Sequence, residues 1–107
     1  MLLTVFRSRL KPEGREEYMQ WAERMSAAAR AMPGYVSHKV FVADDGERVT
    51  IVEFESEEAQ RAWRMHPEHR EAQRKGREIY YQSYSLQICE VKRQSKFERA
   101  ASSQAAE

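Results

Sequence analysis

Residues 35–55, YVSHKVFVADDGERVTIVEFE, decide the fold of this chain. Within them, residues 35–43 and 48–55 alternate side chains between two faces, as β-strands do. The intervening residues 44–46, DDG, are a strong hairpin signal because Asp and Gly tolerate the backbone angles of a tight turn. The stretch therefore predicts two adjacent antiparallel strands, and the segments on either side must be arranged around them.

The segment before this hairpin predicts a strand followed by an amphipathic helix. Residues 2–9, LLTVFRSR, have the pattern of a strand. In residues 15–32, apolar side chains recur at steps of 4, 3, 4 and 3, which places them on one helix face. This stripe consists of Tyr18, Ala22, Met25, Ala29 and Met32. Pro33 and Gly34 end the helix, because proline cannot continue it and glycine suits its terminus.

After the hairpin, the sequence predicts an interrupted helix and a last strand. Ser56 is a candidate N-cap for a helix that carries Trp63. Pro67 interrupts this helix, and a second short helix follows over residues 67–77. Residues 79–91, IYYQSYSLQICEV, form the last strand and carry apolar side chains on both faces. The chain thus alternates strand, helix, strand, strand, helix, strand.

This order of elements predicts an α+β protein with the ferredoxin-like βαββαβ fold, in which the helices cover one face of a four-stranded antiparallel sheet. We expect residues 1–92 to form the single domain and residues 93–107 to be a tail that is partly disordered. The uncovered sheet face still carries large apolar side chains, which need a partner. We therefore expect a homodimer packed sheet to sheet, with the last strand reaching toward the second subunit.

Composition excludes several other classes of protein. The 107 residues include 18 Lys and Arg against 17 Asp and Glu, a net charge of +1 that predicts no nucleic-acid partner. No apolar run is long enough to span a membrane, and the order of basic and apolar residues at the N-terminus is unlike that of a signal peptide. We therefore expect a cytoplasmic protein without a membrane partner. A single cysteine, Cys89, excludes an intramolecular disulfide, and no glycine-rich phosphate loop is present.

The arrangement of these elements resembles the antibiotic biosynthesis monooxygenase (ABM) family of dimeric α+β barrels. The resemblance covers residues 1–92 and rests on the first strand, the MPGY that ends the first helix, the hairpin, Trp63 and the segment HPEHREAQRKGREIYYQSYSLQICEV. The resemblance implies that two copies of the chain form a dimeric α+β barrel. Some members resemble cofactor-free oxygenases of aromatic polyketides or quinols, others bind and degrade haem, and some are binding or stress-related proteins.

The haem-degrading branch of the family uses an Asn, a Trp and a His. Trp63 matches the Trp of that pattern. Arg7 stands where the resemblance places the Asn, and the chain contains no asparagine. Gln73 stands where it places the axial His, whereas His66 and His69 come too early along the helix. Two of the three residues therefore depart from the pattern and disfavour a haem cofactor, while ligation by His69 stays open.

Three residues are candidates for catalysis. Trp63 is either a large core residue or the wall of a cavity that packs against a flat aromatic substrate. His66 either marks a helix end near a cap or accepts a proton near neutral pH. His38 shares a strand face with three valines and is either a satisfied structural residue or a second base. His66 and His69 could share a helix face, but no third ligand is evident, so no metal site is predicted.

Four further residues are candidates for substrate binding: Arg7, His69, Tyr81 and Tyr84. Arg7 either emerges into solvent at the end of its strand or stabilises a phenolate or enolate oxygen. The tyrosines are either core and dimer contacts or groups that orient a quinol hydroxyl. Together these candidates predict a cofactor-independent monooxygenase that oxidises a small aromatic or quinol-type molecule. A non-catalytic dimeric binding or stress-related module and a haem-binding protein are the alternatives.

Overall fold

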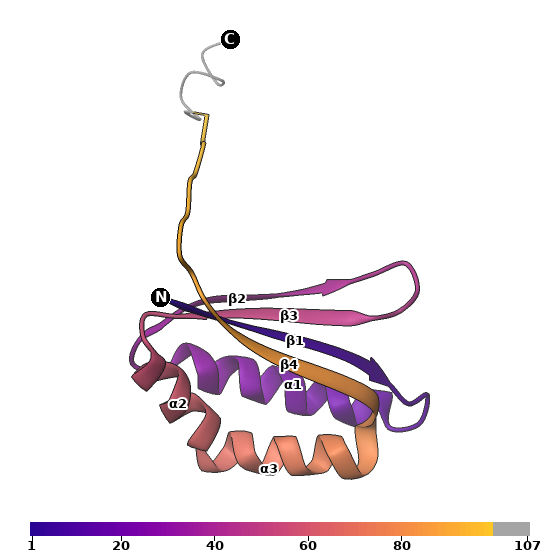
Figure 1. The fold of residues 1–107 in the computed structure, drawn as a ribbon. Helices are drawn as coiled ribbons and strands as arrows, with labels where there is room; N and C mark the ends of the chain where they lie inside the picture. The colour runs from indigo at the N-terminus through magenta and orange to yellow at the C-terminus, as the bar shows by residue number, and fades with distance from the viewer. Residues whose placement is uncertain (100–107) are drawn as a thin grey trace, which may run out of the picture.

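The structure is a computed structural model, and it describes residues 1–99 (Figure 1). Its elements are β1 (Leu2–Leu10), α1 (Arg15–Arg30), β2 (Tyr35–Val42), β3 (Arg48–Phe54), α2 (Glu57–Met65), α3 (Pro67–Lys75), the π-helical turn η1 (Gly76–Tyr80) and β4 (Tyr81–Glu90). Every predicted helix and strand is present, and its bounds lie within two residues of those predicted. Residues 91–99 form no helix or strand, and the rest of the predicted tail lies outside the described residues.

The four strands form one antiparallel sheet in the order β2-β3-β1-β4, which confirms the predicted α+β, ferredoxin-like topology. All the helices lie on one side of this sheet (Figure 1). We call that side the covered face and the other side the open face. Thr4 and Phe6 of β1 lie on the covered face, and Leu3 and Val5 lie on the open face, because side chains alternate along a strand.

The helix boundaries follow the predicted signals. The Ser56 hydroxyl accepts a hydrogen bond from the backbone N–H of Ala59 at 3.1 Å, which confirms it as the N-cap of α2. Pro67 separates α2 from α3, so His66 is at once the C-cap of one helix and the N-cap of the next. Gly34, which follows α1, has φ +82, a left-handed conformation that favours glycine.

The predicted last strand differs from the observed one at its start. Residues 76–80 form a π-helical turn, so β4 begins at Tyr81 instead of residue 79. The pairing of β1 with β4 also shifts register between Arg9 and Leu10. These two irregularities turn Tyr81 toward the covered face, where it joins Tyr84.

The prediction that this strand is apolar on both faces is wrong. Its apolar residues Tyr84, Leu86 and Ile88 pair with Ser8, Phe6 and Thr4 and therefore share the covered face. The open face of β4 carries polar residues and the single cysteine. These residues are Ser83, Ser85, Gln87 and Cys89.

The compact core lies at one end of the covered face. Phe54 of β3 is fully buried, Trp63 of α2 is 6% exposed, and Ala29 of α1 completes the cluster. Partly buried residues from α1, β2, β3 and α2 pack around these three side chains. At the other end of the same face, the rings of Phe6 and Tyr81 meet with their centroids 5.4 Å apart. The sheet and helices are therefore closed by a core at one end and by aromatic rings at the other.

The open face is apolar along its central strands and charged at one end. Leu3 of β1 is half-buried there, and so are Val5, Val49 and Ile51, while Phe41 of β2 is exposed.

No helix of the described residues is both long and apolar enough to cross a membrane.

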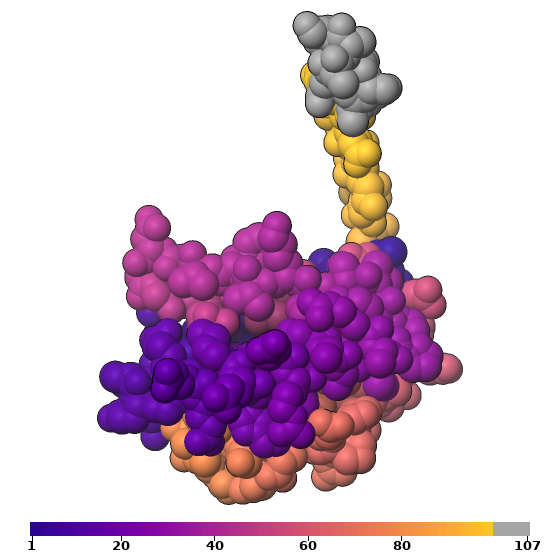
Figure 2. All heavy atoms as spheres, turned by 180° about the vertical axis from the view of Figure 1, so that it is seen from behind, coloured from indigo at the N-terminus to yellow at the C-terminus, as the bar shows by residue number. Residues whose placement is uncertain are grey.

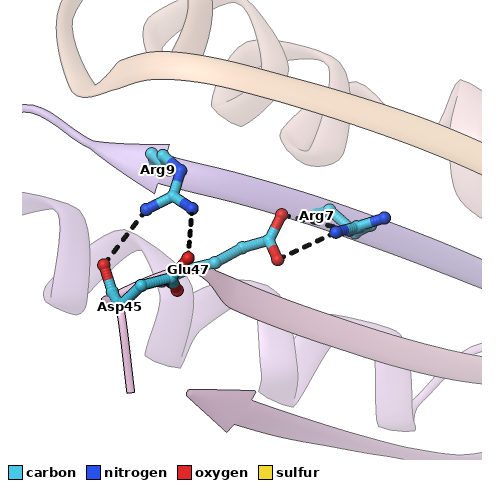
Figure 3. Close-up of polar contacts among 4 residues, drawn as sticks. All are labelled: Arg7, Arg9, Asp45 and Glu47. Carbon is cyan, nitrogen blue, oxygen red and sulfur yellow. Dashed lines mark hydrogen bonds and ion pairs between the residues drawn. The ribbon is translucent and has the colours of Figure 1, made fainter. Parts of the chain in front are cut away.

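Two arginines of β1 connect this strand to the β2–β3 hairpin (Figure 3). Arg7 donates from Nε and Nη2 to the Glu47 carboxylate, both at 3.0 Å. Arg9 donates to the Asp45 carboxylate at 2.7 Å and to its backbone oxygen at 3.1 Å. The bidentate pair fixes the hairpin loop beside β1, although such exposed ion pairs add little to stability.

Candidate functional site

A cavity of about 360 Å³ lies between the covered face of the sheet and the helices. All four strands and all three α-helices contribute side chains to its wall, and the exposed area of this wall is mostly apolar. Seen from behind, the molecule is recessed between α1 and the β2–β3 hairpin (Figure 2). A space of this size and polarity is typical of a site for a small organic molecule.

Trp63 and His69 form a stacked pair in this wall. Their ring centroids are 4.1 Å apart and the ring planes differ by 13°. His69 Nδ1 lies 3.0 Å from the backbone oxygen of Trp63, and because a carbonyl oxygen can only accept, Nδ1 carries the hydrogen. The lone pair of the neutral ring is therefore on Nε2. Burial lowers the pKa of His69, which favours this neutral form at pH 7.

His38, on β2, lies in the same wall and is held between two hydroxyl groups. Its Nδ1 is 2.6 Å from Tyr35 Oη and its Nε2 is 3.1 Å from Ser26 Oγ. Burial, followed by the charge of Arg30, lowers the pKa of His38. Both ring nitrogens are already engaged, so His38 can exchange a proton with the cavity through the Ser26 hydroxyl, which also lines it.

Thr4 and Gln60 are among the polar residues of the wall that were not identified from the sequence. Thr4 Oγ1 is buried and has no hydrogen-bond partner within residues 1–99, so its hydrogen is available to a ligand. Gln60 is 5% exposed and also lines the cavity. In the first strand, Thr4 stands between Leu2 and Phe6 on the same face. A polar residue between two apolar ones was the available signal for Thr4.

An aromatic cluster forms the other end of the wall. Tyr81 and Tyr84 both line the cavity, with ring centroids 5.6 Å apart. Phe6 lies 5.4 Å from each of them, and the Tyr18 ring lies 5.7 Å from that of Tyr81. Burial and the neighbouring Tyr18 raise the pKa of Tyr81, so its hydroxyl stays protonated and can donate a hydrogen bond.

Two of the predicted site residues lie outside the cavity wall. His66 Nδ1 accepts the backbone N–H of Glu68 at 3.2 Å, which is the role of an N-cap. Arg7 lies on the open face and pairs with Glu47, whose hydrogen bonds and charge raise the pKa of the guanidinium. The structure therefore brings Trp63, His38, His69, Tyr81 and Tyr84 into one wall and puts Arg7 on the other side of the sheet. The His66 ring lies 5.8 Å from that of Trp63 but does not line the cavity.

The wall offers little to a metal or haem. Within the described part of the chain, no three His, Cys, Asp or Glu side chains are grouped as a metal site. Gln73 lines the cavity at the place that the family resemblance gives to an axial histidine, and an amide is a poor substitute for imidazole. Arg7, at the place of the Asn, faces the opposite side of the sheet. These two positions do not fit the haem-degrading pattern.

The fold and the site together define a small α+β protein with a ligand-sized cavity between its helices and a four-stranded antiparallel sheet. Residues 1–75 match the model of the antibiotic biosynthesis monooxygenase family, abbreviated ABM. The chain is 35% identical over 91 residues to the uncharacterized protein YqjZ of Bacillus subtilis (strain 168), an alignment that covers 85% of this chain and 80% of YqjZ. The chain therefore belongs to the antibiotic biosynthesis monooxygenase family.

Solved structures share the fold. Rv0793 from Mycobacterium tuberculosis superposes with a TM-score of 0.79 at 18% identity, covering 89% of this chain and 98% of Rv0793. SnoaB, a cofactor-independent oxygenase from Streptomyces nogalater, superposes with a TM-score of 0.75 at 19% identity, covering 91% of this chain and 97% of SnoaB. At these identities the likeness concerns the fold, and the chemistry of this chain has to be argued from its own cavity.

Proposed function

We propose that this protein is a cofactor-independent monooxygenase that oxidises a flat aromatic or quinol-type molecule in the cavity. The observation that carries the proposal is the Trp63–His69 pair. It combines a flat apolar surface for an aromatic ring with an imidazole whose Nε2 is ready to accept a proton. Membership of the ABM family and the oxygenase activity stated for SnoaB support the same reaction class.

The proposed reaction begins with proton transfer from the bound phenol or quinol to His69 Nε2. The hydroxyl of Thr4 and the amide of Gln60 then donate hydrogen bonds to the anion that forms. The electron-rich ring carbon of this anion reduces dioxygen and forms a carbon-bound peroxide. Loss of water from the peroxide leaves a carbonyl group, so a CH₂ group and O₂ yield C=O and H₂O. His38, through Ser26, is the second candidate for the base.

The test compares two histidines that lie one helical turn apart. Oxygen uptake is measured with a panel of hydroxyanthrones and quinols in the presence of a metal chelator. We expect His69→Gln to lower kcat/KM by about 100-fold, the usual contribution of a general base. His66→Asn, which can still cap α3, should keep the wild-type rate. Uptake that is no faster with protein than without it, or equal rates in both variants, would contradict the proposal.

A homodimer in the cytoplasm is part of the proposed function. The half-buried apolar residues of the open face, among them Val5 and Ile51, support packing against a second copy of the chain. This dimer leaves the cavity accessible, because the cavity lies on the covered face.

Haem binding is a second candidate because one observation favours it. His69 Nδ1 is fixed by a backbone carbonyl while Nε2 is free of a partner within residues 1–99, and metal-ligating histidines are commonly held in this way. Titration with haem distinguishes the two functions. A saturable Soret band that His69→Gln abolishes would favour haem binding, and no such band is expected from a cofactor-independent oxygenase.

A further inference from the structure

The charged side chains of the cavity wall are all of one sign. Three arginines line it, Arg48 from β3, Arg64 from α2 and Arg77 from η1, and none of the chain's aspartates or glutamates does. None of the three has a carboxylate within 4.0 Å in the described part of the chain. By contrast, five arginines outside the wall pair with acids: Arg7, Arg9, Arg24, Arg61 and Arg74.

Arg48 is the most enclosed of the three. It is half-buried, whereas Arg64 and Arg77 are exposed at the edge of the cavity. Its guanidinium carbon lies 5.6 Å from the centre of the Tyr18 ring, so one face of the cation rests on an aromatic surface. The edge of the guanidinium keeps its hydrogen-bond donors, because no carboxylate of residues 1–99 pairs with it.

The distance between Arg48 and the histidines of the cavity follows from their positions along the sheet. Val52, four residues further along β3, pairs with His38 and packs against the core that contains Trp63. At the rise of a β-strand, four residues span about 13 Å. The cavity is therefore long enough to hold a molecule of several fused rings, with one end at Arg48 and the other at the histidines.

We infer that the substrate of this site is an aromatic molecule that carries a carboxylate, and that Arg48 binds this carboxylate at the aromatic end of the cavity. The inference rests on the proposed function in one respect, that the cavity holds an aromatic ring. A carboxylate matches the forked donors of one guanidinium. The Tyr18 ring on which Arg48 rests lies 5.7 Å from that of Tyr81, so the guanidinium is at the aromatic end of the cavity. Arg64 and Arg77 at the edge attract the same anion from solution.

The test measures binding and needs no turnover. Anthraquinone-2-carboxylate and anthraquinone-2-carboxamide share the same rings and differ in charge, and both are titrated into the protein by calorimetry at pH 7.5. We expect the carboxylate to bind about tenfold more tightly or better, as a charge-assisted pair allows. Raising NaCl from about 50 to 500 mM should shrink this preference, because salt screens charges near the surface.

Two variants locate the charge responsible. Arg48→Met should bind both quinones with the affinity that wild type shows for the carboxamide, and its intact carboxamide binding would demonstrate that the variant is folded. Arg61→Met removes the same charge from the outer side of α2 and should keep the full preference. Equal affinity of wild type for the two quinones, binding of neither, or an unchanged preference in Arg48→Met would overturn the inference.

The outcomes also separate this inference from the proposed oxygenase. A carboxylate preference that depends on Arg48, in a protein that never accelerates oxygen uptake, would refute the oxygenase and leave the binding site standing. Oxygen uptake together with equal binding of the two quinones would refute the carboxylate site alone.

Discussion

At the residue scale, His69 is constrained at two different parts of its ring. The Trp63 carbonyl fixes the hydrogen on Nδ1, and the Trp63 indole stacks against the ring face. Burial then makes protonation of the ring less favourable and lowers its pKa from the usual value near 6.5. The same direction holds for His38, for the same principal reason.

This direction predicts the pH dependence of the proposed activity. A general base works only in its unprotonated form, so a pKa below 6.5 keeps it active in mildly acidic solution. We expect kcat/KM to stay constant from pH 8 to about 6.5 and to fall only below that. The measurement is a pH–rate profile of oxygen uptake, with the His69→Gln variant as the control that should lose the acidic limb. An acidic limb centred above 6.5 would contradict the assignment of His69.

Residue patterns predicted which strand or helix each candidate occupies, but not which side of the sheet the helices cover. Alternation along β1 puts Arg7 with Leu3 and Val5, and only the packing of the helices on the other side excludes it from the cavity. Arg48 and Thr4 were missed for a related reason. Their importance comes from what faces them across the cavity, and side chains distant in sequence decide that.

At the element scale, the close packing of the turn after α1 against α2 determines how the core end is closed. A Cβ added to Gly34 would lie 2.5 Å from the Cβ of Ala59, in addition to the strain of φ +82. We expect Gly34→Ala to lower the free energy of unfolding by about 2 kcal/mol or more, since the left-handed conformation alone costs about 1–2 kcal/mol. Urea unfolding measures this loss.

Gly46 provides the matched control for that prediction. It has φ +92 in the hairpin loop, and an added Cβ would meet no atom within 4 Å. Gly46→Ala should therefore show the conformational strain without the contact with α2. Equal losses in the two variants would mean that the packing of Gly34 against Ala59 contributes nothing.

The elements with strong sequence signals were predicted well, and the one without a signal was not. Proline at residue 67 and serine at residue 56 act locally, so the break between α2 and α3 and the start of α2 followed from the sequence. The π-helical turn Gly76–Tyr80 has no such local signal, because its geometry depends on Tyr81 packing over Gly76. The start of β4 was therefore mispredicted.

At the scale of the whole molecule, the open face carries half-buried apolar side chains that no helix of the described residues covers (Figure 1). Ile51 lies near the centre of this face, opposite Val5 in the register. We expect wild type to behave as a dimer in light scattering coupled to size-exclusion chromatography, and Ile51→Glu to be a monomer, because a buried unpaired carboxylate opposes association.

Val42 is the matched control for the dimer. It is 62% exposed and lies on the covered face at the end of β2, away from the proposed interface. Val42→Glu should remain dimeric. A monomeric wild type, or dissociation of both variants, would contradict packing through the open face.

The Trp63 side chain is part of both the core and the wall of the cavity. A molecule stacked on its ring therefore adds contacts to the group of side chains that also holds α2 against β3. A ligand that binds only the folded protein raises the free energy of unfolding. Ligand present at about 100 times its dissociation constant would raise it by about 2.7 kcal/mol. In a domain with so few fully buried side chains, the abundance of its substrate in the cell would help to set the lifetime of the folded protein.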